Sequence, residues 1–309
     1  MLRMCGFGNW KLMNPRLLQV QIWRRIMNVE DQWLSSILES YNNPPVFYRG
    51  AKLPSFPPDE LQINTTGQAG YPTLKEAFVF YSDCIEAFSE CGLEVNRHRK
   101  VLDFGVGWGR IARFFLEQIP KENIFGIDVT QDFVDVCKET FDSQNFSVCA
   151  AFPPTELEDN SFDYIVAYSV FSHLSESACR QWMEEFHRIL KPGGMVAVTT
   201  RGRPFFDYCE SLKIGNPEGY SAALSQMFDD FDEARQRYDR GEFVHSSADG
   251  VTGGGAMNSS FYGESFIPKQ YAESAYEQKF RLKKFLFSPP RQTHPIIFYQ
   301  SEKMSSTKD

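Results

Sequence analysis

The residues best suited to hold a ligand are three alternate glycines, Gly105, Gly107 and Gly109, in the stretch VLDFGVGWGR. A hydrophobic run that ends in glycines is typical of a strand followed by a tight turn, where the bare backbone can approach a ligand closely. The spacing is GxGxG, whereas the dinucleotide fingerprint is GxGxxG, and the nucleoside-triphosphate motif GxxxxGK[ST] does not occur. The spacing therefore disfavours both phosphate-bearing ligands.

Two carboxylates flank this turn. Asp103 precedes Gly105 by two positions, and Asp128 ends the next hydrophobic run, NIFGID. A fixed carboxylate repels a pyrophosphate and attracts a cation, and an acid at the end of the second strand can accept hydrogen bonds from both ribose hydroxyls. A nucleoside with a positively charged tail meets both demands. S-adenosylmethionine, which carries a ribose, an ammonium and a sulfonium, is such a molecule.

Strand and helix patterns alternate from Lys100 to Thr200, which predicts a parallel sheet covered on both faces. Ligands of such sheets bind beyond the carboxyl ends of the strands. The expected strands are KVLDF, NIFGID, FSVCA, FDYIVAYSV and MVAVTT, and the expected helices are RIARFFLEQI, TQDFVDVCKETF and ESACRQWMEEFHRIL.

Four motifs in this order resemble those of the class I S-adenosylmethionine-dependent methyltransferases, particularly the type 11/12 group. VLDFGVGWGR is similar to the first motif, GIDVTQDFVDVCKE to the second, DNSFDYIVAYSVFSHLSE to the fourth-strand motif, and RILKPGGMVAVTT to the turn before the fifth strand. The resemblance covers about residues 98–202 closely. It implies a Rossmann-like α/β fold with a seven-stranded, mostly parallel sheet, helices on both faces and a C-terminal antiparallel strand.

The resemblance also implies S-adenosylmethionine as the cofactor, and methyl transfer to an oxygen or nitrogen of a small-molecule or glycan-type acceptor by in-line displacement. Many family members have an acid after the third strand for the adenine amine, but VCAAFPP offers none there. We therefore expect backbone groups and the apolar face of Phe152 to hold adenine. The expected cofactor-binding residues are Asp103, Gly105, Gly107, Gly109, Asp128, Val129, Phe152 and Tyr168.

Three side chains are candidates for the transfer step. The sulfonium already activates the methyl group, so the protein mainly aligns donor and acceptor, while a base would add about 10² to 10⁴ in rate. His173 is the first candidate because its position faces the site in the resembling family; a capping or buried histidine is the alternative. Tyr168, at the end of the fourth strand, either lines the transfer pocket or fills the core.

The third candidate is His245, which flanks the glycine-rich stretch DGVTGGGAMNSS (249–260) together with Tyr262 and Glu264. If this stretch is a lid, these side chains reach the acceptor. The alternative is a solvated loop with a chance histidine.

The segments before and after the strand–helix region are expected to cover the ligand site. Residues 1–72 are expected to form a helical and Pro-rich extension, with amphipathic helices between 14 and 41 and irregular chain up to 72, in which Gln62, Thr65 and Thr66 are the polar residues placed to meet the donor. Residues 73–309 are expected to form the methyltransferase domain, with a substrate-cover insertion at about 203–270 that includes a helix over 221–238. The runs FRLKKFLF and HPIIFYQ predict a terminal hairpin.

Composition limits the kinds of binding partner that we expect. The chain has 309 residues and a net charge of −8, which disfavours nucleic acid and anionic membranes, and no run of about 18 apolar residues occurs. Seven cysteines without CxxC or zinc-ligand spacing predict reduced thiols and no metal. The first residues contain no continuous apolar core of signal-peptide type, so we expect a cytoplasmic protein. We expect it to be a monomer or homodimer. Two alternative functions stay open: an NAD-dependent oxidoreductase, and a non-catalytic binding module on the same fold.

Overall fold

The computed structural model describes residues 32–253, 255 and 257–302, which form two compact units, 32–56 and 57–302. The second unit begins before the boundary at 72 and 73 that the sequence suggested. In the first, helix α2 (Gln32–Asn42) buries Trp33, whose ring lies 4.6 Å from that of Tyr48. The two-residue strands β1 (Phe47–Tyr48) and β2 (Ala51–Lys52) pair with each other. The rest of the expected amphipathic region, 14–31, lies outside the described residues.

A seven-stranded sheet organises the second unit, in the order β10-β11-β7-β6-β3-β4-β5. The five strands from β7 to β5 are parallel, and β11 is antiparallel to both β7 and β10. This is the Rossmann-like arrangement that the sequence predicted. The strands are β3 (Val101–Phe104), β4 (Ile124–Asp128), β5 (Phe146–Val148), β6 (Phe162–Ala167), β7 (Leu190–Thr199), β10 (Phe280–Leu286) and β11 (Ile296–Ser301).

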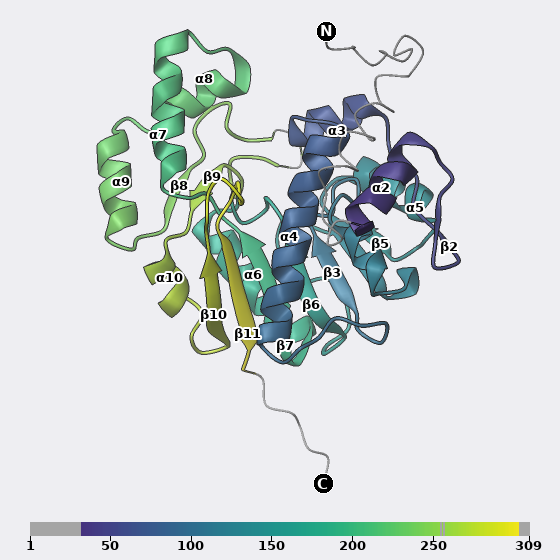
Figure 1. The fold of residues 1–309 in the computed structure, drawn as a ribbon. Helices are drawn as coiled ribbons and strands as arrows, with labels where there is room; N and C mark the ends of the chain where they lie inside the picture. The colour runs from purple at the N-terminus through teal and green to yellow at the C-terminus, as the bar shows by residue number, and fades with distance from the viewer. Residues whose placement is uncertain (1–31, 254, 256, 303–309) are drawn as a thin grey trace, which may run out of the picture. The chain divides into compact units, whose positions relative to one another are not determined.

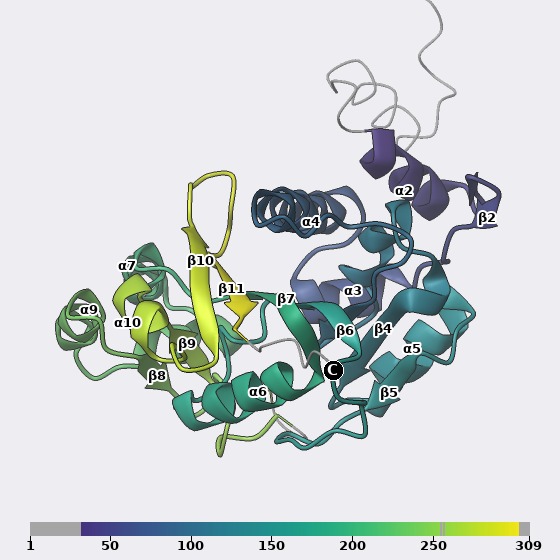
Figure 2. The same ribbon diagram turned by 90° about the horizontal axis from the view of Figure 1, so that it is seen from below.

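Helices cover both faces of this sheet because alternate strand residues are apolar on each side. Phe104 of β3 packs on Trp182 of α6, with ring centroids 4.4 Å apart, whereas Tyr164 of β6 stacks on Phe88 of α4 at 4.6 Å. Figures 1 and 2 show α4 and α6 on opposite faces. The helices are α3 (Asp59–Thr66), α4 (Tyr71–Glu90), α5 (Gln131–Phe141), α6 (Glu176–Ile189) and α10 (Lys269–Ser274).

The chain order reverses between β3 and β6. From β3 the chain continues to β4 and β5 at one end of the sheet, then returns to β6 on the other side of β3. The carboxyl ends of β3, β4 and β6 therefore lie together at one edge, and a crevice at such a switch point is where open parallel sheets bind ligands.

Three segments differ from their expected secondary structure. After β3 the chain forms a short 3₁₀ helix, η2 (Ala112–Glu117), in place of an α-helix, and the expected irregular chain before residue 72 contains α3. The helix expected over 221–238 is two helices, α8 (Gly219–Gln226) and α9 (Phe231–Asp239). The break occurs because the Asp230 carboxylate accepts the N–H groups of Asp232 and Glu233 and so starts a new helix.

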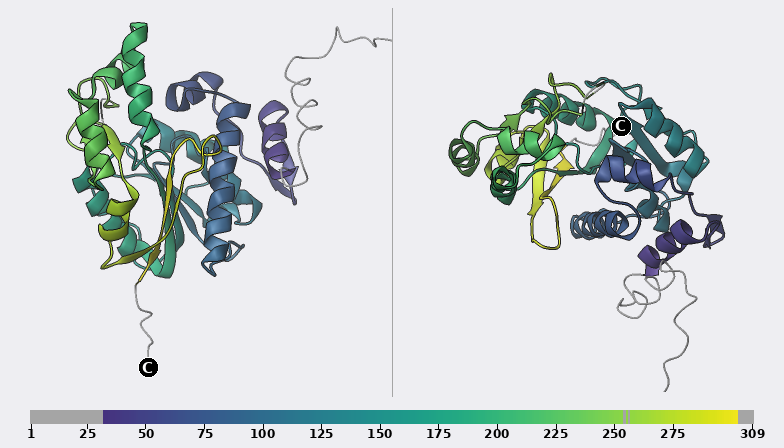
Figure 3. Two further views of the ribbon diagram at one scale, coloured as in Figure 1. Left: turned by 60° about the vertical axis from the view of Figure 1, so that its left-hand side comes forward. Right: turned by 90° about the horizontal axis from the view of Figure 1, so that it is seen from above.

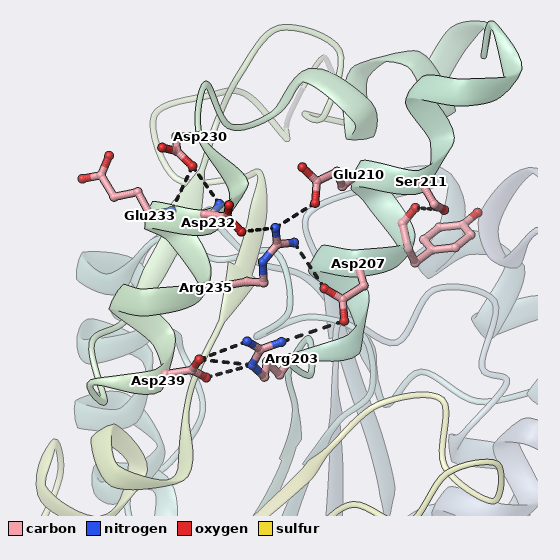
Figure 4. A network of polar contacts seen from close by, with 10 residues as sticks. Arg203, Asp207, Glu210, Ser211, Asp230, Asp232, Glu233, Arg235 and Asp239 are labelled. Carbon is pink, nitrogen blue, oxygen red and sulfur yellow. Dashed lines mark hydrogen bonds and ion pairs between the residues drawn. The ribbon is translucent and has the colours of Figure 1, made fainter.

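The insertion between β7 and β10 has a hydrophobic core of its own, and Figure 3 shows its helices beyond the β10 end of the sheet. Helices α7 (Pro204–Ser211), α8 and α9 surround Phe206, which stacks on Phe266 of β9 with centroids 3.8 Å apart. Arg235 of α9 bonds to carboxylates of both α7 and α9 (Figure 4). The strand pair β8 (Val244–Ser246) and β9 (Glu264–Phe266) leads back toward the sheet.

In the described part of the chain, no helix combines the length and the apolar character that crossing a membrane requires. Nor do three or more His, Cys, Asp or Glu side chains gather there in a way that would hold a metal ion.

Candidate functional site

A cavity of about 420 Å³ lies where the turns after β3, β4 and β6 meet. This volume lies within the usual range for small-molecule sites. Polar and apolar side chains share its wall, and α3 and the segment after residue 252 add to it. Its lining includes Asn64, Thr65, Thr66, Gly105, Val106, Gly107, Trp108, Arg110, Asp128, Val129, Phe133, Cys149, Ala151, Tyr168, Ser169, His173, Met257, Phe261 and Tyr262.

The glycine turn is built for close approach. The N–H groups of Gly105 and Val106 donate to Ile127 O at 2.9 and 3.1 Å, which ties the turn to β4. A Cβ on Gly105 would lie 2.4 Å from Cγ2 of Val170, so only glycine fits there. Gly107 has φ +51° and no neighbour within 4 Å of its missing Cβ, which leaves a bare backbone at the cavity wall.

Asp128 lies at the end of β4, where it binds the turn and lines the cavity. Its Oδ2 accepts the N–H of Gly107 at 2.9 Å and its Oδ1 accepts the N–H of Thr130 at 3.0 Å. Burial raises the pKa of this carboxyl above its usual value. Each carboxylate oxygen has two acceptor sites, so the side chain can bind the turn and a pair of ligand hydroxyls together.

Asp103 does not lie in the cavity, which corrects its expected role. Its side chain points to the face of the sheet opposite Phe104, where Oδ2 accepts the N–H of Ala112 at 2.9 Å. The carboxyl is 2% exposed, and this burial raises its pKa well above the usual value. Asp103 therefore holds the start of η2 and is not placed to contact a donor cation.

We expect Asp103→Asn to leave S-adenosylmethionine binding unchanged within about 0.5 kcal/mol, the usual limit for a residue outside a site. An ionised buried carboxylate with a raised pKa costs stability at neutral pH, and the amide oxygen can still accept the Ala112 N–H. We therefore expect the variant to be at least as stable as wild type near neutral pH. Calorimetry measures its affinity for the donor, and urea unfolding near neutral pH measures its stability. Donor binding weakened more than about tenfold, about 1.4 kcal/mol, in a variant of normal stability would show that the charge acts on the donor.

Three other expected residues also lie outside the cavity lining. A Cβ on Gly109 would meet Cε2 of Phe141 at 2.5 Å, so this glycine permits packing of α5. The Phe152 ring packs on Phe261 at 5.7 Å. His245 lies at a separate shallow depression with Nδ1 2.7 Å from Ser265 Oγ, and burial lowers its pKa. Packing of segments distant in sequence explains all three corrections.

The apolar part of the cavity lies beside Asp128. Val129, Phe133, Cys149 and Ala151 line it, and the indole N–H of Trp182 donates to Ala151 O at 3.0 Å. These surroundings suit a planar aromatic base, which needs apolar contact on its faces. Val129 was expected from the sequence, whereas the contribution of α5 through Phe133 was not.

Tyr168 lines the cavity, but its hydroxyl is already engaged. The hydroxyl hydrogen-bonds to Glu76, the Arg110 guanidinium lies 4.8 Å from the ring centroid, and the His294 ring lies 5.6 Å away. Burial raises the pKa of Tyr168 well above its usual value. The phenol therefore stays protonated and shapes the wall, together with Arg110, whose Nη1 lies 2.6 Å from Glu76 Oε2.

His173 lines the cavity and belongs to a buried polar network. Its Nδ1 lies 2.8 Å from Gly263 O and 3.1 Å from Glu264 Oε1, and its ring stacks on Tyr262 with centroids 4.9 Å apart. Glu264 is fully buried and pairs with Arg201 at 2.6 Å. The segment after the glycine-rich loop is held here because Gly263 N donates to His173 O at 2.8 Å.

Because of the buried Glu264 carboxylate, we expect the folded protein to lose stability in acid. Burial alone would raise its pKa, but the charges of His173 and Arg201 outweigh burial and lower the pKa to about 2. Because the unfolded value is about 4.3, ionisation stabilises the folded state above that pH by about 3 kcal/mol. This contribution is lost as the pH falls from about 4.3 toward 2.

Urea unfolding at about pH 6 and about pH 3 tests this expectation. Wild type should lose about half of this contribution, about 1.7 kcal/mol, between the two pH values, and Glu264→Gln should not lose it. Glu139→Gln, at an exposed position of α5, is the matched control and should behave as wild type. Equal pH dependence in wild type and Glu264→Gln would contradict the prediction.

The N-terminal side of the cavity comes from α3. Thr65 and Thr66 line the cavity as the sequence suggested, while Gln62 is buried and holds the backbone, with Oε1 accepting the N–H of Gly70 at 3.2 Å. Sequence reasoning missed Asn64 and Arg110. The arginine directly follows the glycine motif, and this adjacency was the available signal.

Comparison with known proteins identifies the central segment. Residues 101–194 match the profile of a family described as a methyltransferase domain. A malonyl-[acyl-carrier protein] O-methyltransferase of Ilyobacter polytropus is 24% identical over 165 residues, 52% of this chain and 62% of that protein. A demethylmenaquinone methyltransferase of Chlorobaculum tepidum is 30% identical over 102 residues, 33% of this chain and 40% of that protein.

The sequence likeness is confined to part of each curated relative. The matched part of this chain spans between 26% and 62% of the length of four curated relatives. Among solved structures, an S-adenosylmethionine-dependent methyltransferase from Mesorhizobium loti superposes with a TM-score of 0.45 and 11% identity, over 70% of this chain and 96% of that one.

Proposed function

We propose that this chain, whose residues 101–194 match a methyltransferase-domain family, is a class I S-adenosylmethionine-dependent methyltransferase that transfers a methyl group to a small-molecule or glycan-type acceptor. The observation that carries the proposal is one cavity of about 420 Å³ lined by both Asp128 and His173. Asp128 can accept hydrogen bonds from the ribose of the donor, and His173 can accept a proton from the acceptor. Their presence in one cavity is what methyl transfer requires.

The cavity fits the donor in its chemistry. The bare backbone of Gly107 permits close contact, Asp128 offers acceptors to the ribose hydroxyls, and the apolar residues beside Asp128 suit adenine. Arg110 brings a guanidinium to the lining for the donor carboxylate, and Asn64 and Thr65 add polar atoms. When bound, the donor supplies an electrophilic methyl on its sulfonium.

The chain's own contribution is alignment, exclusion of water and one base. His173 is the base of this proposal because it lines the cavity, whereas the hydroxyl of Tyr168 is bound to Glu76 and His245 lies elsewhere. The segment around Tyr262 covers His173 and so shields the reacting atoms from water. The acceptor oxygen or nitrogen would approach the methyl in line with the sulfur.

Calorimetry on the full chain tests the proposal. We expect wild type to bind S-adenosylmethionine, and to bind NADH at least tenfold more weakly (about 1.4 kcal/mol), since the turn lacks the dinucleotide spacing. Tight NADH binding without donor binding would favour an oxidoreductase instead. Donor binding with no labelled methyl passing to any fraction of a cell extract would favour a non-catalytic binding module.

A further inference from the structure

The side chain of Glu264 reaches His173 from a different part of the chain. Glu264 begins β9, after the insertion, and is fully buried, with Oε1 3.1 Å from Nδ1 of the imidazole. Its Oε2 lies 2.6 Å from Nε of Arg201, and the Tyr220 hydroxyl of α8 donates to Oε1. One buried carboxylate thus contacts a cation, a phenol and the candidate base.

The neighbours of His173 determine which ring nitrogen carries the proton. Nδ1 faces the carbonyl oxygen of Gly263 at 2.8 Å and the carboxylate of Glu264, and both groups only accept hydrogen bonds. The neutral imidazole must therefore be protonated at Nδ1, which leaves a lone pair on Nε2. Nε2 lies 3.4 Å from the hydroxyl oxygen of Ser169, another residue of the cavity lining.

Ser169 shows what Nε2 can bind. A hydroxyl 3.4 Å from an unprotonated imidazole nitrogen can donate its hydrogen to that nitrogen. Ser169 also has a left-handed backbone with φ +58°, an uncommon conformation for a residue other than glycine, and its N–H donates to Thr199 Oγ1 at 2.7 Å. The distance of 3.4 Å is longer than an ordinary hydrogen bond, so an acceptor hydroxyl that comes closer to Nε2 can replace Ser169 as its donor.

Glu264 also prepares His173 for a positive charge. The pKa of Glu264 is lowered to about 2, so the carboxylate stays ionised and faces the imidazolium that forms when Nε2 takes a proton. Arg201 prevents an uncompensated negative charge in the core. The charged and titratable groups around this pair include Arg201, Cys209, Tyr220, His245, Tyr262 and His294.

We propose that the acceptor's reacting group is a neutral alcohol or phenol hydroxyl that gives its proton to His173 Nε2, and that Glu264 positions His173 for this step. The inference rests on the proposed function and narrows it to O-methylation. The O–H proton moves to Nε2, the oxygen forms the new C–O bond, and the electron pair of the broken S–C bond stays on sulfur. The proton later leaves Nε2 to solvent.

Other nucleophiles fit this arrangement less well. A carboxylate has no proton to give, and the lone pair on Nε2 would repel it. An ammonium has no lone pair, so it would have to lose a proton before it could attack the methyl, and it would add a positive charge beside the sulfonium. A neutral amine is nucleophilic without a base, so a buried carboxylate that supports the base would serve no purpose.

Nitrogen NMR of the histidine side chains tests the arrangement without any acceptor. The His173 signals are assigned by comparison with His173→Ala, in protein saturated with S-adenosylhomocysteine. We expect a protonated Nδ1 and an unprotonated Nε2 in the neutral ring. A proton on Nε2 would overturn the inference and leave the proposed methyl transfer standing.

The linkage in the product tests the acceptor class. Full-length protein is incubated with methyl-labelled S-adenosylmethionine and an extract of the source cells, and the labelled product is hydrolysed. A methyl ether, stable to mild alkali, supports the inference. An alkali-labile ester or an N-methyl product overturns it and leaves the proposed function intact. If the protein binds no donor, the proposed function itself fails.

Two variants separate positioning from a merely structural role. Glu264→Gln should lower kcat about 10- to 100-fold with the acceptor KM unchanged, and should move the acidic limb of the pH–rate profile to lower pH. Tyr220→Phe removes a hydrogen-bond donor to the Glu264 carboxylate but leaves no buried charge unpaired. The carboxylate then stabilises the imidazolium more strongly, so the acidic limb of the pH–rate profile should move slightly to higher pH. If Glu264→Gln does not fold, the pH–rate profile of Tyr220→Phe tests the positioning role by itself. An acidic limb at the wild-type pH in every variant that folds would contradict that role.

Discussion

His173→Ala should lose methyl transfer by about 10² to 10⁴-fold in kcat, the usual worth of a well-placed base, while S-adenosylmethionine binding changes by less than about 0.5 kcal/mol. The imidazole lines the cavity and is held by Gly263 and Glu264, whereas the apolar residues and Asp128 remain for the donor. Transfer of labelled methyl to the extract acceptor measures kcat, and calorimetry measures donor affinity.

A matched control keeps this result specific. His98→Ala removes an exposed histidine outside the cavity lining and should behave as wild type. Added imidazole should restore part of the activity of His173→Ala, because the truncated side chain leaves space beside Tyr262. Full activity in His173→Ala would show that the acceptor needs no base and would remove the residue from the mechanism.

Asp128→Ala should weaken S-adenosylmethionine binding by about 1.5 to 3 kcal/mol, because charged hydrogen bonds to the ribose are lost. The same substitution removes the acceptor for the N–H groups of Gly107 and Thr130, so the turn itself loses support. Calorimetry with S-adenosylmethionine and with S-adenosylhomocysteine measures the loss.

The two ligands separate a ribose contact from an effect on charge. Both contain the ribose, so a carboxylate that binds its hydroxyls should lower both affinities equally. A larger loss for S-adenosylmethionine would instead mean that Asp128 acts on the sulfonium. Asp132→Ala, at an exposed position in the first turn of α5, is the control and should bind both ligands as wild type does.

Local pattern was enough to predict the glycine turn and Asp128. The strands that end at Phe104 and Asp128 are short apolar runs followed by turn residues, so their period and their ends could be predicted, and with them the glycine turn and the acid beside it. The 3₁₀ helix η2 escaped prediction because its apolar residues also fit an α-helical spacing. The break between α8 and α9 did have a local signal, the cap at Asp230.

Asp103 shows the limit of reasoning from charge and spacing alone. Its position beside the turn was correct, but successive strand residues face opposite sides of a sheet. With Phe104 packed on α6, the carboxylate of Asp103 faces the start of η2. Electrostatic attraction depends on this direction, so the expected contact with a donor cation was lost although the fold was right.

The sequence by itself therefore determined the sheet, the glycine turn and the acid at the end of β4, because each depends on residues close together in the chain. Only the tertiary structure decided that His173, and not His245, lines the cavity, and which side chains support it. Glu264 reaches His173 from 91 positions away, as 264 minus 173 gives, and Arg201 reaches Glu264 across 63 positions. Such contacts are set by how the insertion packs on the sheet, and no local pattern encodes that packing.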